Sequence, residues 1–333
     1  MLKEFGFILA KVLLTPISLI YGFVQFVRRG LYHTGVLRSQ DLPGTVISIG
    51  NIEAGGTGKT PVVIALAKWL QEEGFTPVIL TRGYRSGLKS HETAILVNEV
   101  TVLQTGSSEF SADEAQQQSA DLSDVPVVIG ANRLEGAKTY LRNFKEPTHW
   151  ILDDGFQHLK ISRNIDILLL DYDHPFGNGF PIPSGHLREF PFTKRFADII
   201  CFTRGPERLP DPKSICIPFL NNQFTKVAGP DTGTSPKQGN FLVLSGIAKP
   251  AKLMETLARL GVNTSNHIII GDHERFAFQE FIGNLNEFDG IITTRKDFYR
   301  QKLEFIQLNK PVYVLELTAD ISQLTSALTT QTK

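Results

Sequence analysis

The sequence predicts an α/β protein with two lobes, the first built on a parallel sheet, and an N-terminal helix outside both. Three observations predict this architecture: short runs of Val, Ile and Leu that alternate with helical stretches, a glycine-rich turn between one such run and a helix, and a long apolar N-terminal segment. Continuous apolar runs are typical of strands buried on both faces of a parallel sheet. A chain of 333 residues is long enough to give two lobes their own cores.

The bulk composition points to an ordinary globular protein. The formal net charge is +0, so the overall charge gives no indication of a nucleic-acid partner. The two cysteines, Cys201 and Cys216, match neither a metal-binding spacing nor a disulfide framework. Their scarcity is typical of a reducing compartment.

Residues 1–38 are expected to form a membrane-associated helical arm. Residues 5–27 are mostly apolar, but Lys11 and Pro16 interrupt the run, whereas a spanning helix needs about 20 apolar residues without charges. A secretory signal would be followed by a small-residue cleavage site, and the basic stretch RRGLYHTGVLR follows instead. Polar residues recur at three- and four-residue spacing and would form one stripe on the helix: Lys11, Thr15, Ser18, Gly22, Gln25 and Arg29.

The charges around this segment indicate what it contacts. Basic residues flank the apolar run, and Glu4 is the only acid before Arg38. Such a helix is typical of the surface of an anionic membrane, which we expect to be a partner. The alternative is a helix buried against the protein body, which leaves the basic flanks unexplained.

The rest of the chain divides into residues 39–222 and a smaller α/β domain, residues 223–333, that closes over the site. The first part contains the candidate strands TVISIG, TPVILTRG, PVVIGA, HWILDD, IDILLLD and ADIICFTR. After stretches rich in proline, glycine and polar residues, the pattern resumes with FLVLSGI, NHIIIGDH, GIITTRKD and PVYVLEL. Ligands of open α/β sheets lie at the carboxyl ends of the strands, so the polar clusters found there predict a single site.

The strand TVISIG leads into EAGGTGKT and then into a helix that starts near Pro61. This is the P-loop arrangement, in which backbone amides and a helix N-terminus bind phosphate oxygens. Lys59 is expected to reach the β- and γ-phosphates, and Thr60 to hold magnesium. The sequence thus predicts a P-loop NTPase-like parallel sheet lobe, residues 39–222, that binds a nucleotide through Glu53, Ala54, Gly55, Gly56, Thr57, Gly58, Lys59 and Thr60.

Two departures from P-loop patterns bear on the function. The pattern G-x-x-x-x-G-K-[ST] has glycine where this chain has Glu53. The core GGTGKT is shared with deviant Walker ATPases of the ParA and MinD type, which carry a second lysine directly before the paired glycines. That position is Ala54 here. The sequence therefore argues against one possible function, that of a membrane-recruited ATPase switch, which is kept as an alternative.

A second apolar strand runs into HWILDDGFQH. P-loop enzymes place a carboxylate that works with magnesium at such a strand end. Asp153 and Asp154 are therefore candidate metal ligands, with a solvated turn as the alternative. Gln157 and His158 follow as polar groups able to orient a nucleotide or a water molecule.

Three arginines are candidate phosphate or substrate contacts, because guanidinium groups donate to phosphate in a bidentate manner. Arg82 in TRGYR and Arg133 in GANR follow predicted strands, and Arg188 lies in the loop PSGHLRE. In the same loop, Glu189 is a candidate member of the magnesium shell.

A kinase also needs a group that accepts the proton of the hydroxyl it phosphorylates. Candidates are Asp113 and Glu114 in SADEA, and Asp272 and His273 in GDHERF. An Asp–His pair formed between the lobes could share this role. Spacing alone does not choose Asp113 among the acids.

Seven motifs occur in the order found in the tetraacyldisaccharide 4′-kinase family, the lipid A 4′-kinases of Gram-negative bacteria, which the chain resembles: GNIEAGGTGKTP, TRGYR, DDGFQH, PSGHLRE, SGIAKP, GDH and TTRKD. The resemblance covers essentially the whole chain. It implies transfer of the γ-phosphate of ATP, with Mg²⁺, to the 4′-hydroxyl of a tetraacylated disaccharide 1-phosphate to form lipid IVA. It also implies work at the cytoplasmic face of the inner membrane, and Asp113 assisted by His273 as the catalytic pair.

The chain departs from the family pattern at three places. SADEA stands where the family has GDEP, Arg295 stands where Glu is usual, and Glu53 stands where Ser or Thr is usual.

A further alternative is a kinase for a soluble metabolite, with the N-terminal helix packed internally. The adenine contacts, the acyl-chain preference and the oligomeric state are not determined by the sequence.

Overall fold

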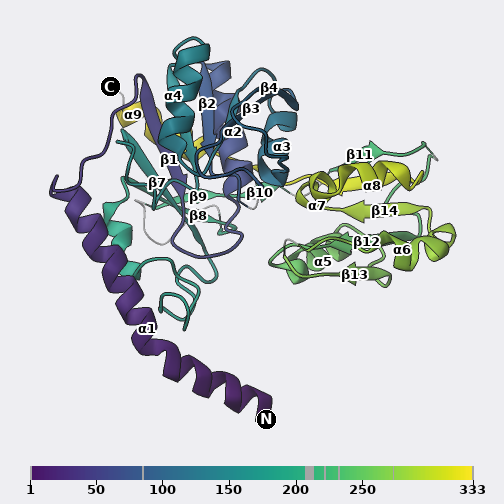
Figure 1. The fold of residues 1–333 in the computed structure, drawn as a ribbon. Helices are drawn as coiled ribbons and strands as arrows, with labels where there is room; N and C mark the ends of the chain where they lie inside the picture. The colour runs from purple at the N-terminus through teal and green to yellow at the C-terminus, as the bar shows by residue number, and fades with distance from the viewer. Residues whose placement is uncertain are drawn as a thin grey trace.

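The computed structural model describes residues 2–84, 86–206, 214–220, 223–231, 233–272 and 274–331. Over these ranges the chain forms two α/β lobes that lie side by side, and helix α1 (Leu2–His33) extends along the larger lobe and past it (Figure 1). Both lobes contain parallel strands, so the predicted α/β class is confirmed.

The larger lobe is built on a nine-stranded sheet with the order β4-β3-β5-β2-β6-β1-β7-β8-β9. Its strands are β1 (Thr45–Gly50), β2 (Pro77–Thr81), β3 (Ala94–Val97), β4 (Val100–Gln104), β5 (Val127–Ile129), β6 (His149–Asp153), β7 (Ile165–Asp171), β8 (Ile199–Thr203) and β9 (Ile215–Ile217). Strand β3 pairs in antiparallel fashion with β4 and β5, and the other pairs are parallel. Strand β1 lies between β6 and β7, so the loops after β1 and β6 emerge side by side at one edge of the sheet.

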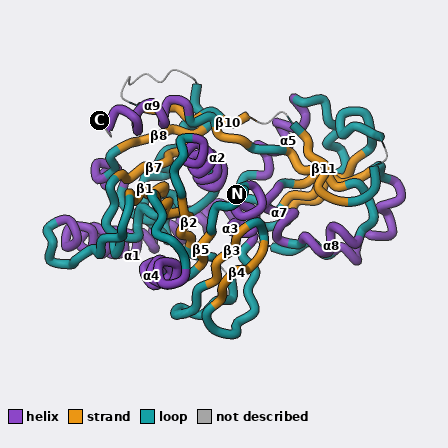
Figure 2. The backbone as a smooth tube through the Cα atoms, turned by 90° about the horizontal axis from the view of Figure 1, so that it is seen from above, coloured by secondary structure: helices purple, strands orange, loops and turns teal. Residues whose placement is uncertain are grey.

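Helices cover both faces of this sheet, as Figure 2 shows for α2 (Lys59–Glu72) and α4 (Arg133–Asn143). Helix α2 packs Val62, Leu66 and Leu70 into a core that also contains Ala115 of α3 (Asp113–Asp121). On the other face, Leu134 and Tyr140 of α4 pack against a second cluster. The apolar spacing of three and four residues in α2 explains why it forms a helix on this surface.

The smaller lobe is a five-stranded sheet with the order β11-β15-β14-β12-β13. Its strands are β11 (Phe224–Ala228), β12 (Phe241–Ser245), β13 (His267–Ile269), β14 (Gly290–Thr293) and β15 (Val312–Leu315). Its helices are α5 (Pro250–Arg259), α6 (Phe278–Phe281), α7 (Arg295–Arg300) and α8 (Lys302–Gln307), and a 3-10 helix η2 (Ile282–Glu287) follows α6. The larger lobe also contains a 3-10 helix, η1 (Pro191–Phe196). Helix α7 begins after Thr294, whose hydroxyl accepts from the amide of Asp297 and caps the helix.

The last segment of the chain differs from the expected division into 39–222 and 223–333. Strand β16 (Thr318–Ala319) pairs with β10 (Phe219–Leu220), and helix α9 (Ser322–Gln331) then packs against the larger lobe. Leu324 and Leu328 are buried in the same core as Ile217 of β9. The chain therefore crosses between the lobes twice and ends on the first, a return that no local sequence signal reveals.

Helix α1 has the reverse of the usual surface pattern. From Ser18 to Arg29 its predicted polar stripe faces the protein: Ser18 and Arg29 are buried, and Gly22 lies so close to Phe190 that a Cβ atom would be 2.6 Å from the ring. Large apolar side chains face outward instead, namely Leu13, Ile17, Leu19, Ile20, Phe23, Val24 and Val27. Among the described residues, no helix combines the length and apolar character needed to cross a membrane.

Candidate active site

The P-loop follows β1 and ends in the first turn of α2. Gly55 and Gly58 have backbone φ angles of 149° and 82°, which residues with a Cβ atom rarely adopt. At Gly58 a Cβ would also come within 2.3 Å of the Phe219 ring. Gly58 is the N-cap residue of α2 and offers no side-chain acceptor to the first amides of the helix. These amides are therefore suited to bind an anion.

Two side chains hold this loop in place, Asn51 directly after β1 and Thr203 at the end of β8. Asn51 donates to Thr57 at 2.9 Å and accepts from the Lys59 ammonium at 3.2 Å. The Thr203 hydroxyl donates to the Thr57 carbonyl at 3.1 Å. The loop is thus fixed from both sides before any ligand binds.

Glu53 does not need the conformational freedom of glycine. Its backbone forms an antiparallel bridge with Leu187, and it is absent from the residues with positive φ. The next amide, of Ala54, donates to the His186 carbonyl at 2.6 Å. Within the P-loop, the residues that line the cleft begin at Ala54, so Glu53 forms the base of the loop without facing the site.

The two adjacent carboxylates at the end of β6 have different environments. Asp153 is buried and accepts at Oδ2 from Thr81 at 3.2 Å and from Gln118 at 2.8 Å. Burial and the nearby Glu114 carboxylate raise the pKa of Asp153. The neighbouring Asp154 lies at the same edge, but cations dominate its surroundings.

Asp154 has a left-handed backbone, with φ of 51°, that turns its carboxylate toward basic groups. Arg188 donates to its two oxygens at 2.8 and 2.6 Å, and the Lys59 ammonium lies 3.4 Å from Oδ1. Burial raises the pKa of Asp154, but Lys59, Arg188 and Arg133 outweigh this effect and hold that pKa well below its usual range. The carboxylate therefore stays ionised.

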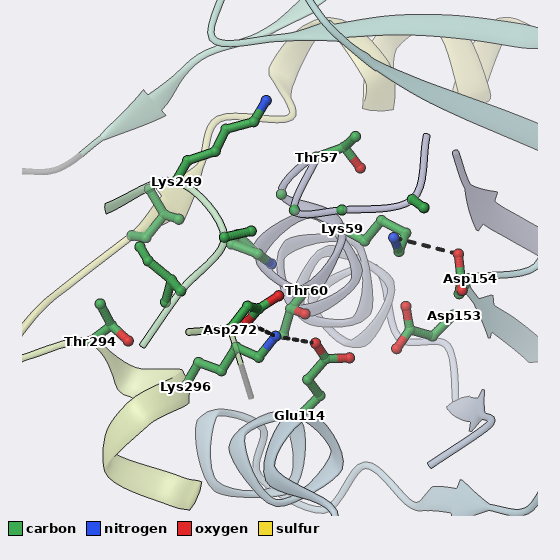
Figure 3. A pocket seen from close by; sticks show the side chains of 18 of the residues that line it. Thr57, Lys59, Thr60, Glu114, Asp153, Asp154, Lys249, Asp272, Thr294 and Lys296 are labelled. Carbon is green, nitrogen blue, oxygen red and sulfur yellow. Dashed lines mark ion pairs between the residues drawn. The ribbon is translucent and has the colours of Figure 1, made fainter. Parts of the chain in front are cut away.

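The donor set at this edge fits a magnesium ion that arrives with a nucleotide. No group of three or more His, Cys, Asp or Glu side chains among the described residues could hold a metal alone. Thr60, Asp153 and Asp154 nevertheless line one cleft, where Figure 3 shows Asp153 beside Asp154 and Lys59. Magnesium usually binds to one or two carboxylates together with phosphate oxygens and water, which this set allows.

Glu189 does not lie where a magnesium ligand is expected. Both of its oxygens accept from Arg29 of α1, at 2.8 and 2.7 Å, and its side chain is buried. Glu189 is also absent from the residues that line the cleft, unlike its neighbour Arg188. The structure thus separates two neighbours that the sequence placed in one site.

The other predicted contacts are brought together in the cleft, whose lining includes Arg82, Arg133, Gln157, His158 and Arg188. Arg133 donates to the Asp154 carbonyl at 3.1 Å, and Gln157 donates to the Asn51 carbonyl at 2.9 Å. Burial, together with the charge of Arg133, lowers the pKa of His158 to about 3, so its imidazole is neutral. A neutral ring can donate through one nitrogen and accept through the other.

The cleft lies between the lobes and has a volume of about 1260 Å³. The smaller lobe contributes Lys296, whose ammonium is 3.1 Å from Glu114 and 3.5 Å from Asp272, and Figure 3 shows it between these acids. It also contributes Lys249, which pairs with Asp171 of β7 at 2.9 Å. The sequence prediction missed both lysines, although each lies in a quoted motif, SGIAKP or TTRKD, after a strand.

Asp113 is the first residue of α3. Its Oδ2 lies 3.4 Å from Nε of Arg300, which belongs to α7 of the smaller lobe. It lines a small cavity that adjoins the cleft and shares Glu114 with it. His273 lies outside the described residues, and its neighbour Asp272 lines the cleft.

Comparison with known proteins gives one consistent family. A family model described as tetraacyldisaccharide-1-P 4′-kinase matches residues 10–333. A tetraacyldisaccharide 4′-kinase of Pelobacter propionicus is 36% identical over 269 residues, which cover 78% of this chain and 73% of that protein. A protein of the same name from Idiomarina loihiensis is 32% identical and covers 86% and 82%.

A solved structure extends the likeness to the whole fold. The crystal structure of LpxK from Aquifex aeolicus in complex with ATP superposes with a TM-score of 0.74 at 25% sequence identity. The match covers 96% of this chain and 98% of that one. With a family model that spans nearly all of the sequence, these likenesses show that the chain belongs to the tetraacyldisaccharide 4′-kinase family.

Proposed function

We propose residue roles for the reaction of this family, in which the γ-phosphate of ATP is transferred to the 4′-hydroxyl of a tetraacyldisaccharide 1-phosphate. ATP is placed with its β- and γ-phosphates against the amides of residues 54–60. Lys59 contacts these phosphates, and Arg82, Arg133 and Arg188 are further phosphate or substrate contacts. One observation carries this assignment: the P-loop lysine and the two carboxylates at the end of β6 face the groups of the smaller lobe across a single cleft.

The negative charge of the transferred group is compensated by cations around the cleft. Thr60, Asp153 and Asp154 would hold magnesium, which supplies a Lewis acid to the phosphate oxygens. Arg188 and Lys59 both contact Asp154, so they are already oriented at the edge where the phosphates lie. Donors fixed before the reaction stabilise the developing charge without reorganising.

Asp113 is proposed as the proton acceptor, assisted by His273. The bond between the acceptor oxygen and the γ-phosphorus forms as the bond to the β–γ bridging oxygen breaks, and ADP leaves. The hydroxyl proton passes to Asp113. Ion pairs from the smaller lobe, Arg300 to Asp113 and Lys296 to Glu114, hold both acids of the first turn of α3.

The test is a transfer assay with γ-labelled ATP and the lipid disaccharide acceptor in mixed micelles. We expect the label to appear on the lipid. Without the acceptor, ATP hydrolysis should be at least about 10²-fold slower than transfer is with it. The competing function, an ATPase switch, predicts hydrolysis that does not depend on the acceptor. Equal rates of ATP hydrolysis with and without the acceptor would exclude the residue roles proposed above.

We further propose that α1 binds the anionic inner-membrane surface from the cytoplasmic side. From Ser18 to Arg29 its polar stripe packs against the protein body. Its outward face presents several large apolar side chains, which the surface of a soluble protein rarely gathers on one helix. Ile20 and Phe23 are 65% and 60% exposed. A helix in this orientation can lie in the interface while the cleft remains in water.

Replacing Ile20 and Phe23 by glutamate is expected to weaken binding to phosphatidylglycerol-containing vesicles by at least about 10-fold, since each apolar side chain contributes about 1.5–3 kcal/mol when buried. Co-sedimentation measures the bound fraction. The matched control is Val100→Glu with Val102→Glu, two exposed valines of β4 on the larger lobe. Equal losses from both double variants would show that α1 has no special role in membrane binding.

A further inference from the structure

Arg29 of α1 joins three parts of the molecule in a buried position. Its Nε and Nη2 donate to the two oxygens of Glu189, and Nη2 also donates to the Phe156 carbonyl at 2.8 Å. Its guanidinium lies over the Phe156 ring, 4.1 Å from the centroid. Arg29 is 3% exposed, so this ion pair is shielded from water and from salt.

Both segments that Arg29 holds belong to the loops of the candidate site. Phe156 lies two residues after Asp154, and Glu189 directly follows Arg188, whose guanidinium binds the Asp154 carboxylate. The neighbouring Arg28 donates to the Gln157 carbonyl at 3.2 Å. The same helix therefore holds the loop that contains the carboxylates and the loop that contains their arginine partner.

The packing of α1 extends this contact toward the cleft. The Ser184 amide, in the loop before Arg188, donates to the Ser18 hydroxyl at 2.8 Å. Two residues of the turns between Ser18 and Arg29, Tyr21 and Gln25, line the cleft itself. The helix is thus a wall of the site as well as the part that carries the apolar outer face.

We propose that Arg29 is a positioning residue for phosphoryl transfer, which docks the N-terminal helix onto the loops of Asp154 and Arg188 and so sets the geometry of the phosphate site. A buried ion pair is seldom the most stable way to fill a core, because apolar side chains of similar volume do as well or better. Its advantage is direction, because one guanidinium fixes a carboxylate and a carbonyl at defined angles. Glu189 then acts through Arg29 and not on magnesium.

The test is steady-state transfer in mixed micelles, where binding to a membrane does not limit the rate. Arg29→Met is expected to lower kcat by about 10²-fold and to change the KM for ATP by less than about threefold, because a small misplacement of catalytic groups costs this much. Arg29→Lys keeps the charge but not the fork of donors, so it should recover about a tenth of the lost rate. The fraction of Arg29→Met that co-sediments with vesicles should equal that of the unaltered chain.

The matched control is Arg275→Met, which breaks an ion pair with Glu304 on the smaller lobe and should leave kcat within about twofold. If Arg29→Met does not fold, the variant with both Arg29→Met and Glu189→Gln leaves no lone buried charge and takes its place. A low kcat in this double variant supports the role of Arg29. A kcat close to that of the unaltered chain, in either folded variant, overturns it.

The double variant also separates positioning from metal binding. If the pair acts as a unit, kcat of the double variant should lie within about threefold of the lower single variant. If Glu189 instead binds magnesium, Glu189→Gln alone should raise the magnesium concentration needed for half the maximal rate, which would overturn the assignment of Glu189.

Because this role rests on the proposed residue roles, a readout that does not need transfer is also required. Hydrogen exchange of the folded Arg29→Met chain should rise in residues 153–158 and 186–190 and remain unchanged in the smaller lobe. If the unaltered chain transfers no phosphate, the proposed function fails, while increased exchange in these loops still supports the docking role. Unchanged exchange overturns the docking role whatever the activity.

Discussion

Replacement of Lys59 by methionine is expected to lower kcat for transfer by about 10³-fold, the upper range for loss of one preorganised electrostatic contact. Lys59 is the first residue of α2, and its ammonium is held 3.2 Å from Asn51 and 3.4 Å from Asp154. Methionine keeps most of the length of the side chain and removes the charge. The transferred phosphoryl group then loses a cation that its equatorial oxygens need.

The matched control is Lys68→Met, which removes an exposed lysine of the same helix and should leave kcat within about twofold. Transfer of γ-label to the lipid acceptor measures both variants. Circular dichroism should show that both are folded. If Lys59→Met retained more than about a tenth of kcat, the phosphates would not lie against this loop.

The central grouping of the candidate site could be predicted from the sequence because it follows from the topology of a parallel sheet. TVISIG and HWILDD read as buried strands, and parallel strands end at the same edge. When β1 and β6 pair as neighbours, Lys59 and Asp154 must come together. No long-range information beyond strand identity was needed for this part of the site.

Contacts that depend on packing between distant segments could not be predicted in this way. Arg29 and Glu189 are 160 residues apart, and nothing local marks them as partners. The sequence groups Glu189 with magnesium because it follows Arg188 in one loop, but the two side chains contact different partners. The return of α9 to the larger lobe is similar, since a short helix with few apolar residues does not reveal which sheet it covers.

Replacement of Asp113 by asparagine is expected to lower kcat by about 10³-fold, within the range for removal of a general base, with the KM for ATP changed by less than about threefold. Asparagine keeps the size of the side chain and can still accept from the backbone amide of Glu114, which Asp113 Oδ1 contacts at 3.0 Å. It cannot take up the proton of the acceptor hydroxyl. Transfer of γ-label at saturating ATP measures the effect.

The decisive comparison is with Glu114→Gln, because Glu114 lines the cleft and pairs with Lys296 while Asp113 lines the adjoining cavity. If Asp113 is the base, Glu114→Gln should cost much less, about 10-fold, through its loss of the Lys296 contact. Glu99→Gln, at the ion pair with Lys302 elsewhere on the lobe interface, is the control and should stay within about twofold. If Glu114→Gln lost more of kcat than Asp113→Asn, the role of proton acceptor would pass to Glu114. The acid nearest the acceptor oxygen would then be the one that lines the cleft itself.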